Sequence, residues 1–396
     1  MVNEKMRDLG ARRSVIRELF EYGKKRKAEI GEENVFDFSI GNPSVPSPDA
    51  VNETLVRLLS EKDPVALHGY TSAQGDAGVR RAIADYIRAT HGESVDPDLI
   101  YLTVGAAASL TVSLTALLNE GEEVILLAPF FPEYRVFVER TGAKVVSVLC
   151  DTKTFQPDFE ALAAAINERT RAIIVNSPNN PTGAVMTRES IERLSSLLSA
   201  AQEKYGAPIY LIADEPYREL VYGGVEVPYL PAYYSNTVVC YSFSKSVSLP
   251  GERIGYILVS PTMKNAADVY AAVCGAGRAL GFVCAPALFQ YMIPSILGMT
   301  SDISIYDTNR RLLYEALTSY GYEVVKPDGA FYLFVKALEE DANAFCERAK
   351  GEELLLVASD SFGCPGYVRI SYCVTTEQIK RSLPAFARLA KSYGKS

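Results

Sequence analysis

The sequence predicts an α/β fold with a large, mainly parallel sheet flanked by helices and a smaller α+β domain. Between about residues 46 and 300, short apolar runs alternate with amphipathic stretches, which is typical of a parallel sheet covered on both faces. After residue 300 the pattern changes to mixed helices and short strands. The length of 396 residues also exceeds that of a usual single domain. We therefore expect a large domain of residues 46–300 and a small domain formed by 1–45 together with 301–396.

Apolar runs bounded by turn residues predict the strands of the large sheet. In chain order these runs lie at 101–104, 123–127, 172–175, 209–213 and 238–241. An amphipathic stretch at 188–204 predicts a helix between two of them. For the small domain, the pattern predicts helices at 13–27 and 306–319, strands at 322–326 and 330–335, a helix near 343, strands near 354 and 368, and a final helix. Thr375 to Gln378 fits a capping box that opens this last helix.

Composition and charge exclude several classes of protein. The formal net charge is −8, and the only basic run, at 24–27, fits a solvated helix face, so we expect no nucleic-acid partner. No apolar run resembles a signal peptide or approaches the length of a membrane span. The seven cysteines are scattered without a Cys-x-x-Cys pair, which indicates reduced thiols in a cytoplasmic protein and no metal site.

Polar side chains follow three successive strands of the predicted sheet. Asn180 lies in the turn after 172–175, Asp214 and Tyr217 follow 209–213, and Lys245 follows 238–241. Because ligands in open α/β sheets bind at the carboxyl edge of the strands, we expect these side chains to share one site.

Lys245 has neighbours that suit a phosphorylated aldehyde. A lysine amine can condense with an aldehyde once burial and nearby cations favour its neutral form. Ser242, Ser244 and Arg253 offer hydroxyl and guanidinium donors to a phosphate. This pairing suggests pyridoxal 5'-phosphate, whereas the same cluster taken alone also fits a solvated turn.

Over nearly its whole length the chain resembles the fold-type-I pyridoxal-phosphate enzymes, in particular the aspartate aminotransferase superfamily. The resemblance implies that Lys245 is joined to the cofactor aldehyde and that Ser242 and Arg253 hold the phosphate. It also implies that Asp214 pairs with the pyridine nitrogen, while Tyr217 and Asn180 bond the phenolic oxygen of the ring. A carboxylate at that place favours the protonated pyridine, which is the stronger electron sink. Lys245, once released, can act as general base and then acid, so Lys245, Asp214 and Tyr217 are the expected catalytic residues.

Further cofactor contacts follow from the same resemblance. The turn at Gly105, Ala106 and Ala107 opens a helix whose amide groups are suited to the phosphate, although an ordinary glycine loop fits as well. Phe131 is expected to stack on the pyridine ring, with plain core packing as the alternative. Tyr70 matches a tyrosine that reaches the phosphate of a neighbouring subunit, which implies a homodimer with shared active sites; otherwise it lies in a surface turn.

The resemblance assigns Gly41, Asn180, Arg369 and Arg278 to the substrate. Arg369 is expected to clamp the α-carboxylate, for which guanidinium geometry is suited. Arg278 lies at the distance from Lys245 at which dicarboxylate-specific relatives carry an arginine, but the residues after it do not match, and a helix-surface arginine is the alternative. Some relatives also carry a substrate-contacting lysine where Ala107 stands. Without Arg278, neutral and aromatic amino acids fit as well as aspartate.

The expected function is a pyridoxal-phosphate aminotransferase that moves an amino group from an L-amino acid to a 2-oxo acid in a ping-pong cycle, with aspartate and glutamate among the candidate donors. A β-eliminating C–S lyase is the main alternative, because the same lysine and cofactor serve both reactions. A non-catalytic cofactor-binding regulator is less favoured.

Overall fold

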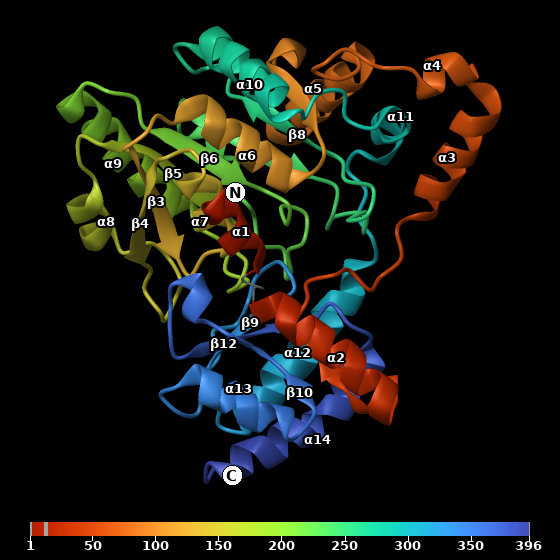
Figure 1. Ribbon diagram of the computed structural model, residues 1–396, viewed down its shortest axis with the longest axis vertical. Coiled ribbons are helices and arrows are strands. Elements are labelled where there is room, and N and C mark those ends of the chain that lie inside the picture. Colours follow the sequence, from red (N-terminus) through yellow and green to blue (C-terminus); the bar gives the residue numbers. More distant parts are fainter. Residues whose placement is uncertain (1, 12–14, 396) are drawn as a thin grey trace.

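The computed structural model describes residues 2–11 and 15–395. Its main feature is a seven-stranded sheet in the order β2-β8-β7-β6-β5-β3-β4 (Figure 1). The strands are β2 (Ile100–Thr103), β3 (Glu123–Ala128), β4 (Lys144–Leu149), β5 (Thr170–Asn176), β6 (Tyr210–Asp214), β7 (Thr237–Ser242) and β8 (Gly255–Val259). In this spatial order, the neighbouring strands β7, β6, β5, β3 and β4 are all parallel to one another. Strand β8 pairs antiparallel with both β7 and β2. The predicted mainly parallel sheet is confirmed.

Each strand of this sheet packs apolar side chains against helices on both faces. In β5, Ile173 and Val175 belong to one apolar core, whereas Ala172 and Ile174 belong to the core on the opposite face. Successive strand residues point to opposite faces, so a strand covered on both sides must be apolar throughout. This explains the uninterrupted apolar runs of the sequence.

Helices α5, α8, α9 and α11 contribute to the first of these cores, and α6, α7 and α10 to the second. The helices of this part are α3 (Asp49–Glu61), α4 (Pro64–His68), α5 (Ala77–His91), α6 (Ala106–Leu117), α7 (Glu133–Glu139), α8 (Phe159–Ala165), α9 (Arg188–Tyr205), α10 (Ala266–Leu280) and α11 (Ala287–Ile296). Among the described residues, no helix is both long and apolar enough to cross a membrane.

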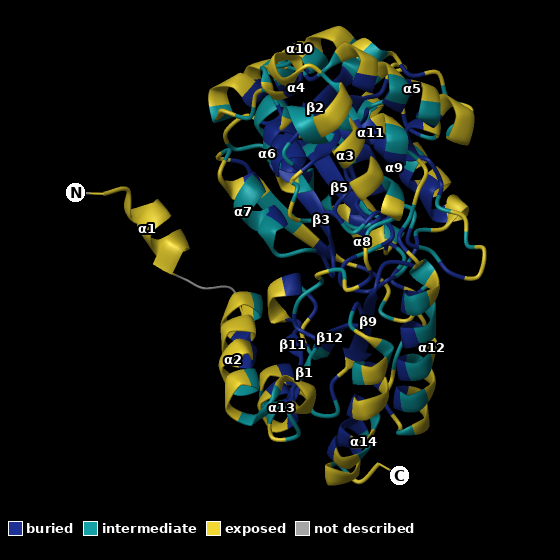
Figure 2. Cartoon of the chain, turned by 90° about the vertical axis from the view of Figure 1, so that its right-hand side faces the viewer, coloured by how far each residue is buried: buried dark blue, intermediate teal, exposed yellow. Residues whose placement is uncertain are grey.

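A second group of elements surrounds a smaller antiparallel sheet of order β11-β12-β9 (lower half of Figure 1). Its strands are β9 (Tyr332–Lys336), β11 (Val357–Ala358) and β12 (Tyr367–Ser371), and β1 (Phe36–Asp37) pairs with β10 (Leu354–Leu355) beside it. The helices of this group are α2 (Val15–Ile30), α12 (Ile303–Ser319), α13 (Ala342–Lys350) and α14 (Thr376–Ser392). Helix α1 (Glu4–Ala11) lies apart from them in Figure 2. Short 3-10 turns lie at Glu32–Asn34 and Asp360–Phe362 in this group, and at Pro97–Leu99 and Leu230–Ala232 beside the large sheet. Figure 2 shows buried residues concentrated in both sheets and an exposed α1. The division at 46–300 stays a prediction.

Two predicted elements of this second group, the strand at 322–326 and the helix from Arg13, need correction or qualification. The strand expected at 322–326 is wrong: among the described residues, only an isolated bridge joins Val324 to Val335. The backbone leaves β9 there because the amides of Asp328 and Gly329 donate to the carbonyl oxygen of Gly183. The helix expected from Arg13 begins among the described residues at Val15 and ends at Ile30, and Arg13 itself lies outside them.

The capping box at the start of α14 forms only on one side. The Thr375 hydroxyl accepts from the amide of Gln378 at 3.2 Å, as expected. The Gln378 side chain instead donates to the carbonyl oxygen of Asp37 at 3.5 Å. The residue that was expected to complete the cap therefore ties α14 to β1.

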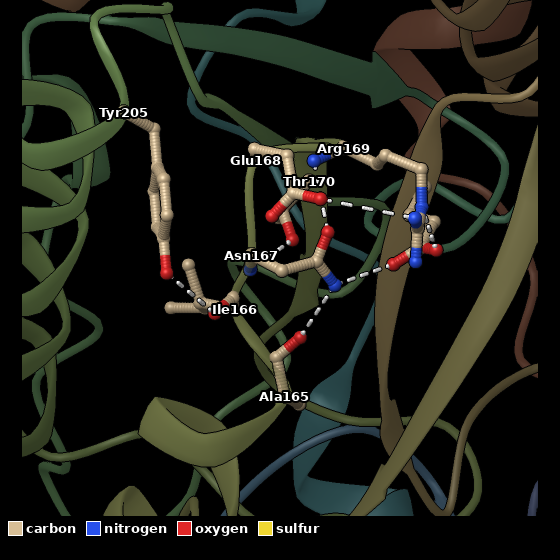
Figure 3. Close-up of polar contacts among 8 residues, drawn as sticks. Ala165, Ile166, Asn167, Glu168, Arg169, Thr170 and Tyr205 are labelled. Atoms are coloured by element: carbon tan, nitrogen blue, oxygen red, sulfur yellow. Dashed lines mark hydrogen bonds and ion pairs between the residues drawn. The ribbon is translucent and has the colours of Figure 1, made fainter.

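A polar network anchors the amino-terminal end of β5, far from the carboxyl edge of the sheet (Figure 3). Asn167 and Arg169 each donate to the Glu123 carboxylate at the start of β3, both at 2.8 Å. The amide of Asn167 donates to the Thr170 hydroxyl at 3.0 Å, and the Tyr205 hydroxyl donates to the carbonyl oxygen of Ile166 at 3.3 Å. Although burial opposes ionisation, the two hydrogen bonds keep the pKa of Glu123 below its ordinary value.

Candidate active site

The carboxyl ends of β5, β6 and β7 meet at one edge of the large sheet, where a cavity of about 320 Å³ opens toward β9 and β12. The cavity is lined by Ile16, Ile40, Gly41, Ala106, Ala107, Leu110, Phe131, Tyr134, Asn176, Asn180, Asp214, Pro216, Tyr217, Ser242, Ser244, Lys245, Pro250, Arg253, Tyr332 and Arg369. The parallel order of the three strands thus brings together the amide, carboxylate and amine that the sequence pattern placed at one edge.

Asp214 presents a buried carboxylate oxygen to this cavity. Its Oδ2 accepts a hydrogen bond from the Tyr134 hydroxyl, whereas Oδ1 has no partner among the described residues. The side-chain amide of Asn176 donates to the Asp214 carbonyl oxygen at 2.8 Å and fixes the backbone. Burial, and then the nearby Glu215, raise the pKa of Asp214 to about 7 although the Tyr134 hydrogen bond acts against this rise. Because buried polar atoms normally have a hydrogen-bond partner, Oδ1 of Asp214 is suited to accept a hydrogen bond from a ligand.

Lys245 stands three residues beyond the end of β7. Its Nζ donates to the carbonyl oxygen of Gly41 at 2.6 Å, which joins the lysine to the chain segment that follows β1. Burial lowers the pKa of Lys245 to about 8, and the charges of Arg369 and Arg253 act in the same direction. Near neutral pH a usable fraction of the amine is therefore unprotonated and can act as a nucleophile.

An anion cradle lies at the start of α6. Ala106 and Ala107 occupy the first turn of this helix, and Ser242 and Arg253 line the same side of the cavity. Gly105 has a φ of 88°, and a Cβ atom there would lie 2.7 Å from the Arg253 guanidinium. Only glycine therefore allows the backbone to approach Arg253 so closely. Helix amides, a hydroxyl and a guanidinium together fit a phosphate group.

Arg369 presents a fully buried guanidinium from β12. Its Nη1 donates to the Asn180 side-chain oxygen at 3.1 Å and its Nη2 to the Ser39 carbonyl oxygen at 2.5 Å. The guanidinium carbon lies 4.9 Å from the ring centre of Tyr332, and the Nε atom has no partner among the described residues. A buried cation with only neutral partners is suited to a carboxylate ligand.

Two tyrosines that sequence reasoning did not assign complete the site. Tyr134 holds Asp214, and the Tyr332 hydroxyl lies 2.9 Å from that of Tyr217. Tyr134 lies in the run Pro129-Phe130-Phe131-Pro132-Glu133-Tyr134, three residues after Phe131, so the sequence did contain a signal for it. Tyr332 comes from β9, and no spacing in the sequence connects it to the large sheet.

The structure brings most predicted site residues into the lining of one cavity, and three are not part of that lining: Gly105, Tyr70 and Arg278. Gly105 adjoins the cavity, next to Arg253. Tyr70 is 97 % exposed, and Arg278 is exposed on α10, so neither lines the cavity of this chain. Phe131 lines the cavity, whereas Phe130 is buried in the core beneath it. Within the described part of the chain, no group of three or more His, Cys, Asp or Glu side chains is placed to hold a metal ion.

Comparison with known proteins agrees with this geometry. The sequence matches the family described as "Aminotransferase class I and II" over residues 33–386. A crystal structure of an aminotransferase from Eubacterium rectale has a TM-score of 0.98 and 59% identity, and the match covers 100% of both chains. Aspartate aminotransferase of Thermotoga maritima is 32% identical, over 93% of this chain and 95% of its own length. Aspartate/prephenate aminotransferase of Thermus thermophilus is 31% identical, over 88% and 89%.

The match extends from before β1 to within α14, so it includes both sheets and every residue that lines the cavity except Ile16. The chain therefore belongs to the class I and II aminotransferases, a family of fold-type-I pyridoxal-phosphate enzymes.

Proposed function

We propose that the chain binds pyridoxal 5'-phosphate in this cavity and transfers an amino group from an L-amino acid to a 2-oxo acid in two half-reactions. The observation that carries the proposal is that the Lys245 amine and the unpartnered Oδ1 of Asp214 face one cavity. An amine for the aldehyde and a carboxylate for the pyridine nitrogen are the two groups that this cofactor requires.

The residues present fit the cofactor at each of its polar groups. Ser242, Arg253 and the first turn of α6, at Ala106 and Ala107, would hold the phosphate. Oδ1 of Asp214 would accept from the pyridine nitrogen, and Phe131 would cover the ring. Asn180 and Tyr217 would donate to the phenolic oxygen. When bound, the cofactor supplies an electron sink for the bond that breaks at the substrate Cα.

The protein groups then have separate tasks. Arg369 binds the α-carboxylate of the substrate and fixes its orientation. Lys245, with its lowered pKa, takes the proton from Cα in its neutral form and returns it at the neighbouring carbon. Asp214 stays ionised beside a protonated pyridine, because the opposite charge offsets the cost of its burial.

Three further features belong to this proposal: the assembly, the division into domains and the location in the cell. We propose a homodimer in which Tyr70 completes the partner's phosphate site, because Tyr70 matches a tyrosine with this task in related enzymes and is almost fully exposed in the single chain. We propose that residues 46–300 form the large domain and 1–45 with 301–396 the small one. A cytoplasmic location is consistent with seven free cysteines, of which five are buried.

The choice of amino donor depends on what faces the substrate side chain. The relatives with aspartate in their names favour a dicarboxylic donor. Lys245, Arg253 and Arg369 are the cations among the described residues that line this cavity, and each already has a proposed task. A dicarboxylic donor therefore requires a further cation such as Arg278, supplied in an assembled dimer.

The test is a spectral titration of cofactor-loaded protein with single amino acids and no acceptor. We expect some of them to convert the visible absorbance of the loaded protein to that of the amino form of the cofactor. Release of pyruvate and ammonia without this conversion would favour the C–S lyase instead. Binding without either change would favour a regulator.

A further inference from the structure

Tyr332, the first residue of β9, contacts two groups of the site at once. Its hydroxyl oxygen lies 2.9 Å from that of Tyr217, and its ring lies under the guanidinium of Arg369 at 4.9 Å. The side chain is 2 % exposed, and it lines the cavity. Nothing in the sequence pattern or the family resemblance assigned a role to this residue.

We propose that Tyr332 is a positioning residue for transamination, whose hydroxyl directs the Tyr217 phenol toward the cofactor and whose ring supports the Arg369 clamp. This inference rests on the proposed function, because both partners act only when cofactor and substrate are bound.

The direction of the hydrogen bond follows from proton counting. Each phenol has one proton, so a Tyr217 that donates to the cofactor can only accept from Tyr332. Among the described residues, the Tyr332 hydroxyl has no hydrogen-bond partner other than Tyr217, and its proton is free for this bond. Burial raises the pKa of Tyr332 to about 12 and raises the pKa of Tyr217 well above its ordinary value, so both phenols stay protonated. A donor chain of this kind strengthens its last bond.

The strand register places the ring of Tyr332 beneath Arg369. Tyr332 pairs with Ser371 across the small sheet, and Arg369 lies two residues from Ser371 on the same face. Such diagonal neighbours are within reach of aromatic and long side chains. The guanidinium therefore rests on an aromatic ring that can attract it without competing for its N–H donors.

Gly41 closes the other side of Tyr332. A Cβ atom at residue 41 would collide with the Tyr332 hydroxyl, so the absence of a side chain there leaves the phenol in place. The charged and titratable groups that face the tyrosine pair are Arg369, Asp214 and Cys373. Burial raises the pKa of Cys373 to about 12, so this thiol stays neutral and does not compete with the phenols.

Two substitutions separate the two contributions. Tyr332→Phe removes the hydroxyl and keeps the aromatic ring. Tyr332→Met removes both the hydroxyl and the ring but keeps much of the buried volume. Tyr372→Phe is the matched control, because this buried hydroxyl donates to the Ala330 carbonyl oxygen at 3.2 Å and does not line the cavity. The melting temperature of each cofactor-free variant shows whether it is folded.

The readouts are the pH midpoint of the visible absorbance of the loaded protein and the kinetics of the first half-reaction. For Tyr332→Phe we expect the midpoint to rise by roughly half a unit, because the phenolic oxygen of the cofactor loses a well-aimed donor. We also expect a maximal rate about tenfold lower, with the amino-acid KM changed less than about twofold. Tyr332→Met should in addition raise KM by about tenfold. Tyr372→Phe should match the wild type in all three.

A double-mutant cycle with Tyr217→Phe tests whether Tyr332 acts through Tyr217. Adding Tyr332→Phe to Tyr217→Phe should cause no further shift of the midpoint. An additive shift, or a Tyr332→Phe variant that behaves like Tyr372→Phe, would overturn the inference and leave the proposed function standing. A wild-type protein that neither takes up the cofactor nor converts it would overturn both.

Discussion

At the scale of single residues, Asp214 combines a cost in stability with a gain in function. Burial gives it a folded-state pKa of about 7, above its value of about 4 in an unfolded chain. The ionised form is thus disfavoured only in the folded protein. The contribution of Asp214 to the stability of the cofactor-free protein should be full below about pH 4 and should be lost as the pH rises through about 7.

Asp214→Asn should remove this dependence. Above pH 7 the cofactor-free variant should melt several degrees higher than the wild type, because no charge is buried. It should bind the cofactor more weakly, because a neutral amide does not favour a protonated pyridine. Calorimetry at pH 5 and pH 8 and a cofactor titration check both effects. Equal melting temperatures of the two proteins at pH 8 would contradict the assignment of a buried, unpartnered carboxylate.

Arg369 carries the prediction about substrate orientation. Arg369→Lys keeps the charge but cannot bind a carboxylate in two places, so we expect KM for every amino acid to rise by a similar factor of about ten or more. Arg80→Lys is the control, because Arg80 is a mostly buried arginine that binds the carbonyl oxygen of Pro97 away from the cavity. Steady-state kinetics with several donors checks this. A rise confined to aspartate and glutamate would mean that Arg369 binds the side chain instead.

The residues of the site differ in how far the sequence alone could predict them. Asp214 ends β6, and Asn180 and Lys245 follow the carboxyl ends of the neighbouring strands β5 and β7, so strand pattern and edge chemistry suffice to group them. Tyr332 reaches the cavity only because β9 of the small sheet places it beside Tyr217, which follows β6 of the large sheet. Contacts of this kind between two sheets leave no periodic signal, which is why its role became visible only in the structure.

At the scale of elements, the Glu123 network holds the amino-terminal ends of β3 and β5 together (Figure 3). The folded-state pKa of Glu123 lies below its unfolded value, so its stabilising effect is present above that unfolded value and disappears as the pH falls. Glu123→Gln should lower the melting temperature by a few degrees at pH 7, because the hydrogen bonds lose their charge.

The difference between wild type and Glu123→Gln should close as the pH falls through the lowered folded-state pKa of Glu123, below which the carboxylate is protonated in both states. Thermal melts from pH 3 to pH 8 measure it. Glu168→Gln is the control in the same loop, since Glu168 is exposed and 3.8 Å from Arg169. A constant difference across the pH range would show that Glu123 acts through packing and not through its charge.

Elements also differ in how well the sequence predicts them. The run at 188–204 predicted α9 closely, because Thr187 caps its start and Gly206 ends it with a φ of 67°. The run at 322–326 has strand-like residues, but backbone bonds to Gly183 draw the chain away after it. Short strands in a small sheet depend on such tertiary contacts more than on their own residues.

At the scale of the whole molecule, the proposed shared site predicts complementation between two inactive variants. In a mixed dimer of Lys245→Ala and Tyr70→Ala chains, one of the two sites has a native lysine and a native partner tyrosine. After exchange of equal amounts, about half of the dimers should be mixed, and activity should recover to about a quarter of the wild-type value.

The complementation is measured by mixing the two variants under conditions that allow subunit exchange. Each variant incubated alone is the control, and sedimentation confirms the dimer. Recovery no greater than the sum of the two separate activities would indicate that each site is built within one chain. In that case Tyr70 would be an ordinary surface residue.

The measurement that tests the central claim most directly is the location of the cofactor on the chain. The loaded protein is reduced with borohydride, digested, and mapped by mass spectrometry. We predict one pyridoxyl group per chain, on the peptide that contains Lys245, and no stable label in the Lys245→Ala variant. A label on another lysine, or an unlabelled Lys245 in protein that has taken up the cofactor, would contradict the account.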